Sequence, residues 1–158
     1  MAEEFYSIGK GEIRQDALLK VTGQAEYTTD IHPRGMVYGK ILGSPIPHGI
    51  IKSIDTSEAE KLPGVVCVVT GEDGPDHPTI GGYLTDRYIM NRVGQKVRYV
   101  GDFVAAVAAT DEQIAEAACK LIKVEYEPLP YVLDVEEAFR EDCPAVVHKD
   151  VQSYKRLD

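Results

Sequence analysis

The sequence predicts an α+β domain with a mixed or antiparallel sheet, one longer helix and several short helices. Apolar runs at residues 36–42, 50–54, 65–69 and 97–109 are typical of strands, and residues 114–122 have the 3.6-residue period of an amphipathic helix. Several connections between these runs are short and uneven, whereas a parallel sheet needs helical crossovers of roughly a dozen residues or more. We therefore expect strands that pair mostly antiparallel, with the helix packed on them.

The N-terminal third of the chain is predicted to begin with an arm and to continue into two strands. Charged residues alternate there with glycines, which predicts an extended arm with turns at Gly9, Gly11 and Gly23. The first strand, Met36–Leu42, ends at a proline-containing segment, because proline cannot donate to a β-ladder. Ile50–Ile54 follows as the second strand.

Two capping boxes predict the starts of helices. Ser57 with Glu60 begins a short helix, and Thr110 with Gln113 begins the longer one, because a hydroxyl at the N-cap and a carboxylate or amide three residues later satisfy two free backbone N–H groups. The longer helix is expected to bury one face at the spacing i, i+3, i+4, i+7, i+8. That face comprises Ile114, Ala117, Ala118, Leu121 and Ile122.

The apolar strand Val65–Val69 is predicted to be covered on both faces, with Cys67 as a small buried hydrophobe. After it, residues 71–96 are rich in glycine and proline, and a connection of this length is often a functional or partner-contacting loop. The chain then returns to strand at Val97–Ala109, with a turn at residues 101–102.

Three further elements are expected near the C-terminus. Ile122–Glu127 alternates apolar and charged residues, as a half-exposed strand does. Asp134–Phe139 resembles a short capped helix, and Ala145–His148 is a candidate last strand. We expect one domain over residues 1–158, with a core at about residues 9–148 and a flexible arm and tail.

Composition narrows the functional classes. The formal net charge of −9 disfavours nucleic acid, which needs a basic face, and anionic membrane surfaces. The N-terminus is acidic and lacks the apolar stretch of a signal peptide, and no window approaches the length of a membrane span. The three cysteines include no close pair, so the sequence gives no sign of disulfides that would need an oxidising compartment. We therefore expect a cytoplasmic protein.

No motif in the sequence predicts an active site of its own. Gly9-Lys10-Gly11 lacks the third glycine and the preceding strand of a dinucleotide site, and no phosphate-binding loop or nucleophile elbow is present. We therefore predict no catalytic, cofactor-binding or metal-binding residue in this chain. The nearest approach to a metal site is a loop cluster that also fits a solvated turn. It consists of Asp73, Asp76, His77 and Asp86.

Four stretches, taken in order, resemble the start of molybdenum hydroxylase large subunits. Residues 14–30 resemble R-x-D-A-x-x-K-V-T-G-x-A-x-Y-x-x-D. Residues 44–65 resemble S-P-x-x-H-A followed by I-D-x-S-x-A-x-x-x-P-G-V, with Gly49 where the family often has alanine. Residues 97–109 match V-x-Y-V-G-x-x-V-A-x-V-A-A, and residues 122–130 match I-x-V-E-Y-E-x-L-P. Each stretch is weak alone, whereas four in this order and spacing are specific.

The resemblance implies the α/β-hammerhead domain that begins the large subunits of the xanthine dehydrogenase and aldehyde oxidase type. In such enzymes a molybdopterin cofactor hydroxylates a carbon centre, a glutamate acts as base, and electrons leave through iron–sulfur clusters. These groups are implied to lie in later domains. The chain is thus expected to be a non-catalytic structural domain, inactive alone, and either an excised fragment or a separately encoded piece of a longer subunit.

The expected partners are the molybdopterin-binding domains of the same large subunit and an iron–sulfur subunit or domain. We hypothesise that the N-terminal arm, including Arg14 and Lys20, and residues 71–96 face those domains, because both segments are irregular. An interface left without its partner would expose apolar surface and favour self-association.

Structural roles are expected for most of the motif residues. Gly23, Gly64 and Gly101 should serve turns, and Tyr27 and Tyr126 should lie at core rims with hydrated hydroxyls. Two other functions stay open at this point. One is a free-standing binding module for a small ligand or a protein, and the other is a small metal-dependent hydrolase built on the loop cluster that contains His77.

Overall fold

The computed structural model describes residues 7–11, 13–75, 87–145 and 147–148. The chain divides into two compact units, Met1–Met36 and Val37–Asp158, and each is described by itself. Among the described residues, no helix has the length and apolar character needed to cross a bilayer.

The smaller unit has more regular structure than the predicted extended arm. It contains α1 (Ala17–Val21) and the 3-10 turn η1 (Thr28–Asp30), and neither buries a residue. Asp16 pairs with both Arg14 and Lys20, at 2.5 and 2.6 Å, and the Lys20 ammonium is the main reason why the pKa of Asp16 lies below its usual value. These exposed pairs lie at the start of the helix, which buries no residue of its own.

Several expectations for the smaller unit are settled by exposure and backbone geometry. Gly9 and Gly23 have positive φ, as turns require. Tyr27 is 55% exposed and Leu18 is 69% exposed, so the expected core rim at Tyr27 is wrong. The prediction is wrong because the helices of this unit bury no residue, so there is no core for the Tyr27 ring to border.

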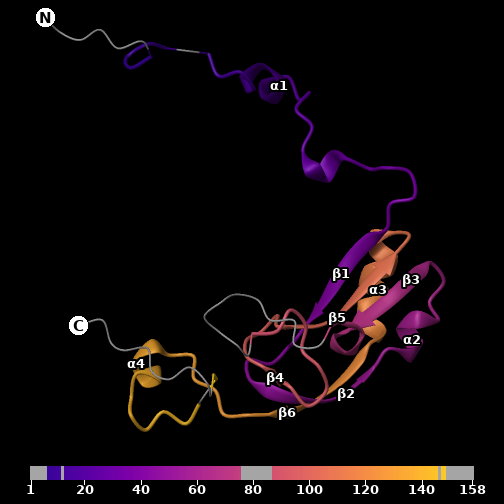
Figure 1. Ribbon diagram of the computed structural model, residues 1–158, viewed down its shortest axis with the longest axis vertical. Helices are drawn as coiled ribbons and strands as arrows, with labels where there is room; N and C mark the ends of the chain where they lie inside the picture. The colour runs from indigo at the N-terminus through magenta and orange to yellow at the C-terminus, as the bar shows by residue number, and fades with distance from the viewer. Residues whose placement is uncertain (1–6, 12, 76–86, 146, 149–158) are drawn as a thin grey trace, which may run out of the picture. The chain divides into compact units, whose positions relative to one another are not determined.

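The larger unit is α+β, as predicted, and its strands form two three-stranded antiparallel sheets (Figure 1). One sheet has the order β1-β5-β3 and the other β4-β2-β6. The strands are β1 (Tyr38–Gly43), β2 (Gly49–Asp55), β3 (Val65–Thr70), β4 (Lys96–Val97), β5 (Phe103–Ala109) and β6 (Lys123–Pro128). The helices are α2 (Ser57–Glu60), the 3-10 turn η2 (Gly71–Asp73), α3 (Glu112–Leu121) and α4 (Val135–Ala138).

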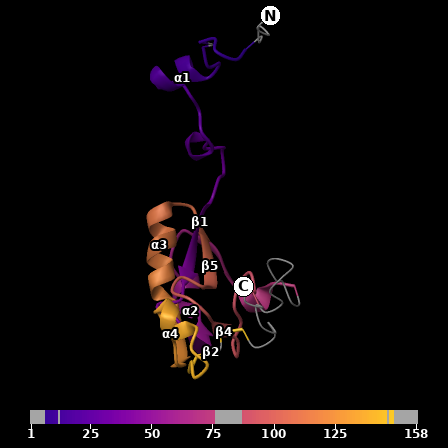
Figure 2. The ribbon, with the colours of Figure 1, turned by 90° about the vertical axis from the view of Figure 1, so that its left-hand side faces the viewer.

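The main core lies between α3 and one face of the β1-β5-β3 sheet (Figure 2). Ala105, Val107 and Ala109 of β5 are buried there, and the two alanines leave room for a close helix. The buried face of α3 is turned by about one residue from the predicted one. Ala115 and Cys119 are buried, whereas Ala117 and Leu121 are exposed, because the sheet covers the side centred on Ala118.

A second core joins the two sheets. Val104, the neighbour of Ala105 on β5, points to the other side of its sheet and packs with Ile51 and Val97. The half-buried Tyr126 ring of β6 borders this cluster, which confirms the core-rim prediction for that residue. The strand β5 therefore serves both cores with alternate side chains.

The two predicted capping boxes are wrong by one residue. The residue that caps α3 is Asp111, whose side chain accepts a hydrogen bond from the N–H of Gln113 at 2.8 Å. Thr110 does not cap the helix, because its N–H donates to the carbonyl of Gly64 at 2.9 Å and keeps this residue beside the turn at Gly64. Thr56 is the N-cap of α2, and its hydroxyl donates to Glu60 Oε1 at 2.6 Å. In both places the preceding strand or turn fixes the residue that enters the helix.

Two predictions about strands are also corrected. The strand β3 lies at the edge of its sheet and exposes Val66 and Cys67, so it is not covered on both faces and Cys67 is not buried. A strand at Ala145–His148 is not found in the described residues of that range, and Val146 lies outside them. The predicted strand at 122–127 and the Asp134-capped helix are confirmed as β6 and α4, and Ile122 ends α3.

A close backbone approach between Gly43 and Gly101 predicts the effect of adding a methyl group. A Cβ on Gly43 would lie 2.7 Å from the Cα of Gly101, whereas a Cβ on Gly39 of the same strand would meet nothing within 4 Å. We expect Gly43→Ala to lower the free energy of unfolding by about 1–3 kcal/mol. Gly39→Ala should leave it unchanged or slightly higher. Urea denaturation of both variants checks this, and equal stabilities would contradict the close contact.

The corrected cap of α3 gives a second prediction. Replacing Asp111 by alanine removes the acceptor for the N–H of Gln113, which should cost about 1 kcal/mol of stability. The matched Thr110→Ala variant loses only the 3.3 Å hydroxyl contact to the carbonyl of Gly64 and should cost less. Thermal melts of both variants decide between the two caps, and the reverse order would restore the capping box predicted from the sequence.

Candidate functional site

Among the described residues of the larger unit, four polar residues are buried: Ser44, His48, Asn91 and Asp102. Two of them join the loop after β1 to the turn before β5. The N–H of Ser44 donates to the carbonyl of Asp102 at 2.8 Å, and the N–H of Gly101 donates to the carbonyl of Ser44 at 2.8 Å. The glycine at 101 has a φ of 91°, which confirms its predicted turn. These bonds place polar groups at the junction of the two sheets.

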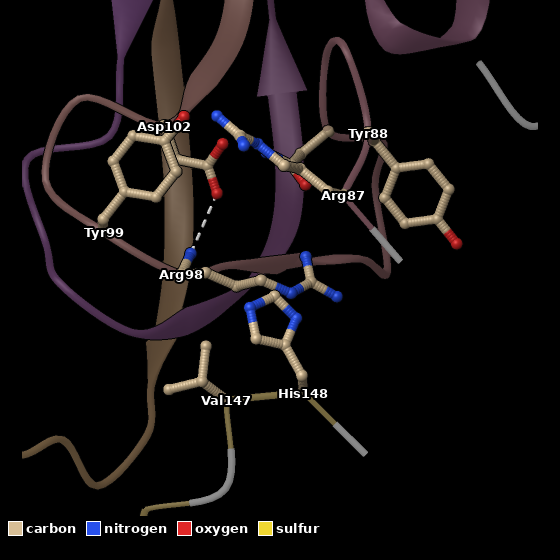
Figure 3. Close-up of a pocket in the computed structure, with 8 residues that line it drawn as sticks. Arg87, Tyr88, Arg98, Tyr99, Asp102, Val147 and His148 are labelled. Carbon is tan, nitrogen blue, oxygen red and sulfur yellow. Dashed lines mark hydrogen bonds between the residues drawn. The ribbon is translucent and has the colours of Figure 1, made fainter. Parts of the chain in front are cut away.

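Asp102 holds the turn before β5 closed. Its Oδ2 atom accepts from the backbone N–H of Arg98 at 2.9 Å, and the Arg98 guanidinium donates to the carbonyl of Lys96 at 2.8 Å (Figure 3). The same guanidinium lies 6.0 Å from the centroid of the Tyr88 ring, within the usual range of a cation–π contact. The buried carboxylate of Asp102 therefore has a structural partner in the turn itself.

Asn91 and His48 each present one buried acceptor that has no hydrogen-bond partner among the described residues. The side chain and backbone N–H groups of Asn91 both donate to the carbonyl of Phe103, which leaves Oδ1 unpartnered. His48 Nδ1 lies 2.6 Å from the carbonyl of Pro130 and must carry the proton, so Nε2 is the free acceptor. Buried polar atoms seldom lack partners, so a water molecule or a ligand atom could complete the bonding of each.

Two hollows adjoin these residues. The first has a volume of about 250 Å³ and contains Asn91 and Asp102 with cationic and aromatic side chains around them (Figure 3). The second, about 370 Å³, is mostly apolar and contains His48. Both are bordered by Arg98, Tyr99 and Val147. The first hollow offers charge and hydrogen bonds, and the second offers apolar surface.

The second hollow holds a histidine and a cysteine, but their contacts are structural. His48 bonds to the carbonyl of Pro130, and the Cys143 thiol lies 3.6 Å from the carbonyl of Ala145. A nucleophile needs its base within hydrogen-bond reach, and the contacts of these two side chains are with the backbone. The described lining residues thus offer binding surface and no assembled nucleophile.

The loop cluster considered for a metal does not assemble in the described structure. Asp73 accepts from the N–H and the hydroxyl of Thr70, at 2.7 and 2.9 Å, and these bonds hold the pKa of Asp73 below its usual value. Asp76, His77 and Asp86 lie outside the described residues. Among the residues that the structure does describe, no group of three metal-binding side chains exists, so the hydrolase hypothesis has no support there.

Arg92 joins the two described parts of the segment 71–96, which are residues 71–75 and 87–96. Arg92 donates from Nε to the carbonyl of Gly71 at 2.8 Å and from Nη2 to the carbonyl of Gly74 at 3.0 Å. Ile89 and Val93 are nevertheless 49% and 45% exposed. The described part of this segment is therefore held by hydrogen bonds and exposes apolar side chains to solvent.

Sequence reasoning missed the buried polar junction. Ser44 and Asp102 both lie in the motif stretches, but nothing in their spacing along the chain shows that they meet. The buried cysteine is Cys119 and not the predicted Cys67, which is exposed. Burial raises the pKa of the Cys119 thiol, so this thiol is protected both by access and by protonation.

The structural role of Asp102 predicts a large effect of its removal. Asp102→Ala would remove the carboxylate that accepts from the N–H of Arg98. Because Asp102 is only 5% exposed, we expect the free energy of unfolding to fall by about 1.5–3 kcal/mol. The control is Asp142→Ala, because the exposed pair of Asp142 with Arg140 should contribute less than about 1 kcal/mol. Chemical denaturation compares them, and a neutral Asp102→Ala variant would contradict this role.

Comparison with known proteins places this chain in one family. The profile of the family described as "Aldehyde oxidase and xanthine dehydrogenase, a/b hammerhead domain" matches residues 22–130. The chain is 42% identical over 145 residues to the "Xanthine dehydrogenase molybdenum-binding subunit" of Escherichia coli O157:H7, which covers 85% of this chain and 19% of that protein. It is 33% identical over 156 residues to the "Carbon monoxide dehydrogenase large chain" of Afipia carboxidovorans, covering 96% of this chain and 19% of the relative.

Solved structures agree with the sequence relatives. The Cu,Mo-CO dehydrogenase superimposes with a TM-score of 0.79 at 33% identity, over 92% of this chain and 18% of that one. Quinoline 2-oxidoreductase from Pseudomonas putida 86 gives a TM-score of 0.79 at 35% identity, over 91% of this chain and 19% of that one. The chain thus spans about a fifth of the length of these relatives. It belongs to the aldehyde oxidase and xanthine dehydrogenase family and has that family's α/β-hammerhead fold.

Proposed function

We propose that this chain is the N-terminal, non-catalytic structural domain of a molybdopterin-dependent hydroxylase or dehydrogenase. The observation that carries the proposal is the match to only a part of longer relatives. The chain spans 19% of one named as a molybdenum-binding subunit and 36% of one named as a large molybdopterin subunit. The site agrees with this role, because its described residues form a closed polar junction without an assembled nucleophile. Residues 1–158 would act as one domain, and the remainder of the enzyme would carry out the reaction.

The cofactors of the full enzyme are proposed to bind outside this chain. An iron–sulfur cluster is commonly held by four cysteine thiolates, and this sequence has three cysteines. Those three are free and differ in burial, and the described residues contain no cluster of three metal-binding side chains. The residues of this chain therefore do not fit an iron–sulfur cluster, and we assign molybdopterin and the clusters to other domains or subunits.

The proposed partners follow from the same assignment. They are the molybdopterin-binding domains of the same large subunit and an iron–sulfur subunit or domain. We also propose a cytoplasmic location, which the three free cysteines and the acidic composition support.

A free-standing binding module is the second candidate. The two hollows and the unpartnered acceptors on Asn91 and His48 favour it, because they could receive a small ligand. This second function requires the chain to be folded and functional without the remainder of a large subunit.

Reconstitution tests the proposed function. The chain is produced alone and together with the polypeptide that completes the large subunit, and molybdenum content and dye-coupled hydroxylase activity are measured. We expect a stable complex that contains molybdenum and is active, and neither property in the chain alone. A folded, monomeric chain that does not associate would overturn the proposal in favour of the binding module. Molybdenum or activity in the isolated chain would contradict the non-catalytic role.

A further inference from the structure

The β1-β5-β3 sheet has a second face that the helix α3 does not cover. Strand register places Ile41, Ala106 and Val69 in one row across that face, and Gly39, Ala108 and Cys67 in the next. Burial along β1 alternates, with residues 38, 40 and 42 less exposed than residues 39 and 41. The two rows therefore point away from α3. These six residues are here called the outer face.

The outer face is apolar and open to solvent. Ile41 is 53% exposed and Val69 is 38% exposed, and Cys67 is also exposed. An antiparallel sheet that faces water normally carries polar side chains on that side. Here neither row contains a charged or hydrogen-bonding side chain other than the thiol, although the chain has a net charge of −9. This composition is typical of a face that another part of a protein covers.

The outer face has a definite relief. Its centre is lined by the small residues Ala106 and Ala108, and Ile41 and Val69 stand on either side of Ala106. Beside Val69 the surface continues into a hollow of about 170 Å³, whose walls include Pro75, Ile89 and Met90 and present only apolar atoms. A trough between two aliphatic side chains, next to an apolar hollow, fits a partner with a ridge of aliphatic side chains.

We propose that the outer face is the docking surface for the remainder of the same large subunit, through an apolar segment that lies over Ala106 and Ala108 and fills the hollow beside Val69. This inference rests on the proposed function. The length of the relatives points to this occupant. More than four fifths of each of two relatives lies outside the region that this chain matches, and that remainder is available to cover the outer face. Linkage to one large subunit keeps that remainder at a high effective concentration beside this face.

The exposed thiol of Cys67 reports directly on this face. The isolated 158-residue chain and the complete large subunit, with the remainder present as the same or a second polypeptide, are treated with iodoacetamide. Alkylation of each cysteine is then followed by peptide mass spectrometry. Cys67 should react at least about tenfold more slowly in the complete subunit, because its face is then excluded from water. The buried Cys119 serves as the internal control and should be slow in both samples.

A matched pair of variants tests the same contact by affinity. Ile41→Lys places a charge in the proposed apolar contact and should weaken association by at least about tenfold. The control is Val135→Lys on α4, where the valine is 67% exposed and outside the outer face, and it should bind as the wild type does. Circular dichroism checks that both variants fold, and if Ile41→Lys does not, the Cys67 measurement on the wild type decides alone.

The outcomes separate this inference from the proposed function. A stable complex in which Cys67 stays as reactive as in the isolated chain would overturn the docking surface and leave the structural role intact. Absence of any complex would overturn the proposed function and this inference together. Protection of Cys67 in the isolated chain that grows with concentration, with a dimer in sedimentation velocity, would identify a second copy as the occupant and overturn the proposal.

Discussion

The whole arrangement depends on a strand that carries no polar side chain. From Phe103 to Ala109, β5 has the sequence FVAAVAA and is the central strand of its sheet. A central strand with apolar residues on both faces gains stability from each face that is removed from water. The helix α3 covers Ala105, Val107 and Ala109 on one side. On the other side the second core covers Val104. Ala106 lies there between the exposed Ile41 and Val69, and Ala108 lies between Gly39 and the exposed Cys67.

This constraint explains where the polar groups of the larger unit lie. Because β5 enters the core directly after its turn, the turn has to satisfy its own backbone, and Asp102 does so by accepting from Arg98. The approach of Gly43 to Gly101 brings the loop after β1 within bonding distance of that turn. The buried polar residues are therefore part of the scaffold that fixes β5. This scaffolding role of the polar residues supports the structural role that we propose for the chain.

Much of the fold could be predicted from the sequence because its signals are local. The period of α3, the alternation in β6 and the aspartate cap of α4 depend only on neighbours along the chain. The errors arose where tertiary contacts decide. The pattern Val65–Val69 does not show that β3 is an edge strand, and the caps of α2 and α3 shift because adjoining strands and turns hold the chain. The polar junction joins residues far apart in sequence, so only the structure could show it.

A structure of the complete large subunit, by crystallography or cryo-electron microscopy, would show whether the outer face is covered. The quantity to measure is the solvent-accessible area of Ile41, Val69 and Ala106. We expect atoms from outside residues 1–158 to cover these side chains and apolar atoms to contribute most of the contact. An outer face that stayed open to solvent, while the rest of the large polypeptide packed elsewhere on this domain, would refute the proposed docking surface.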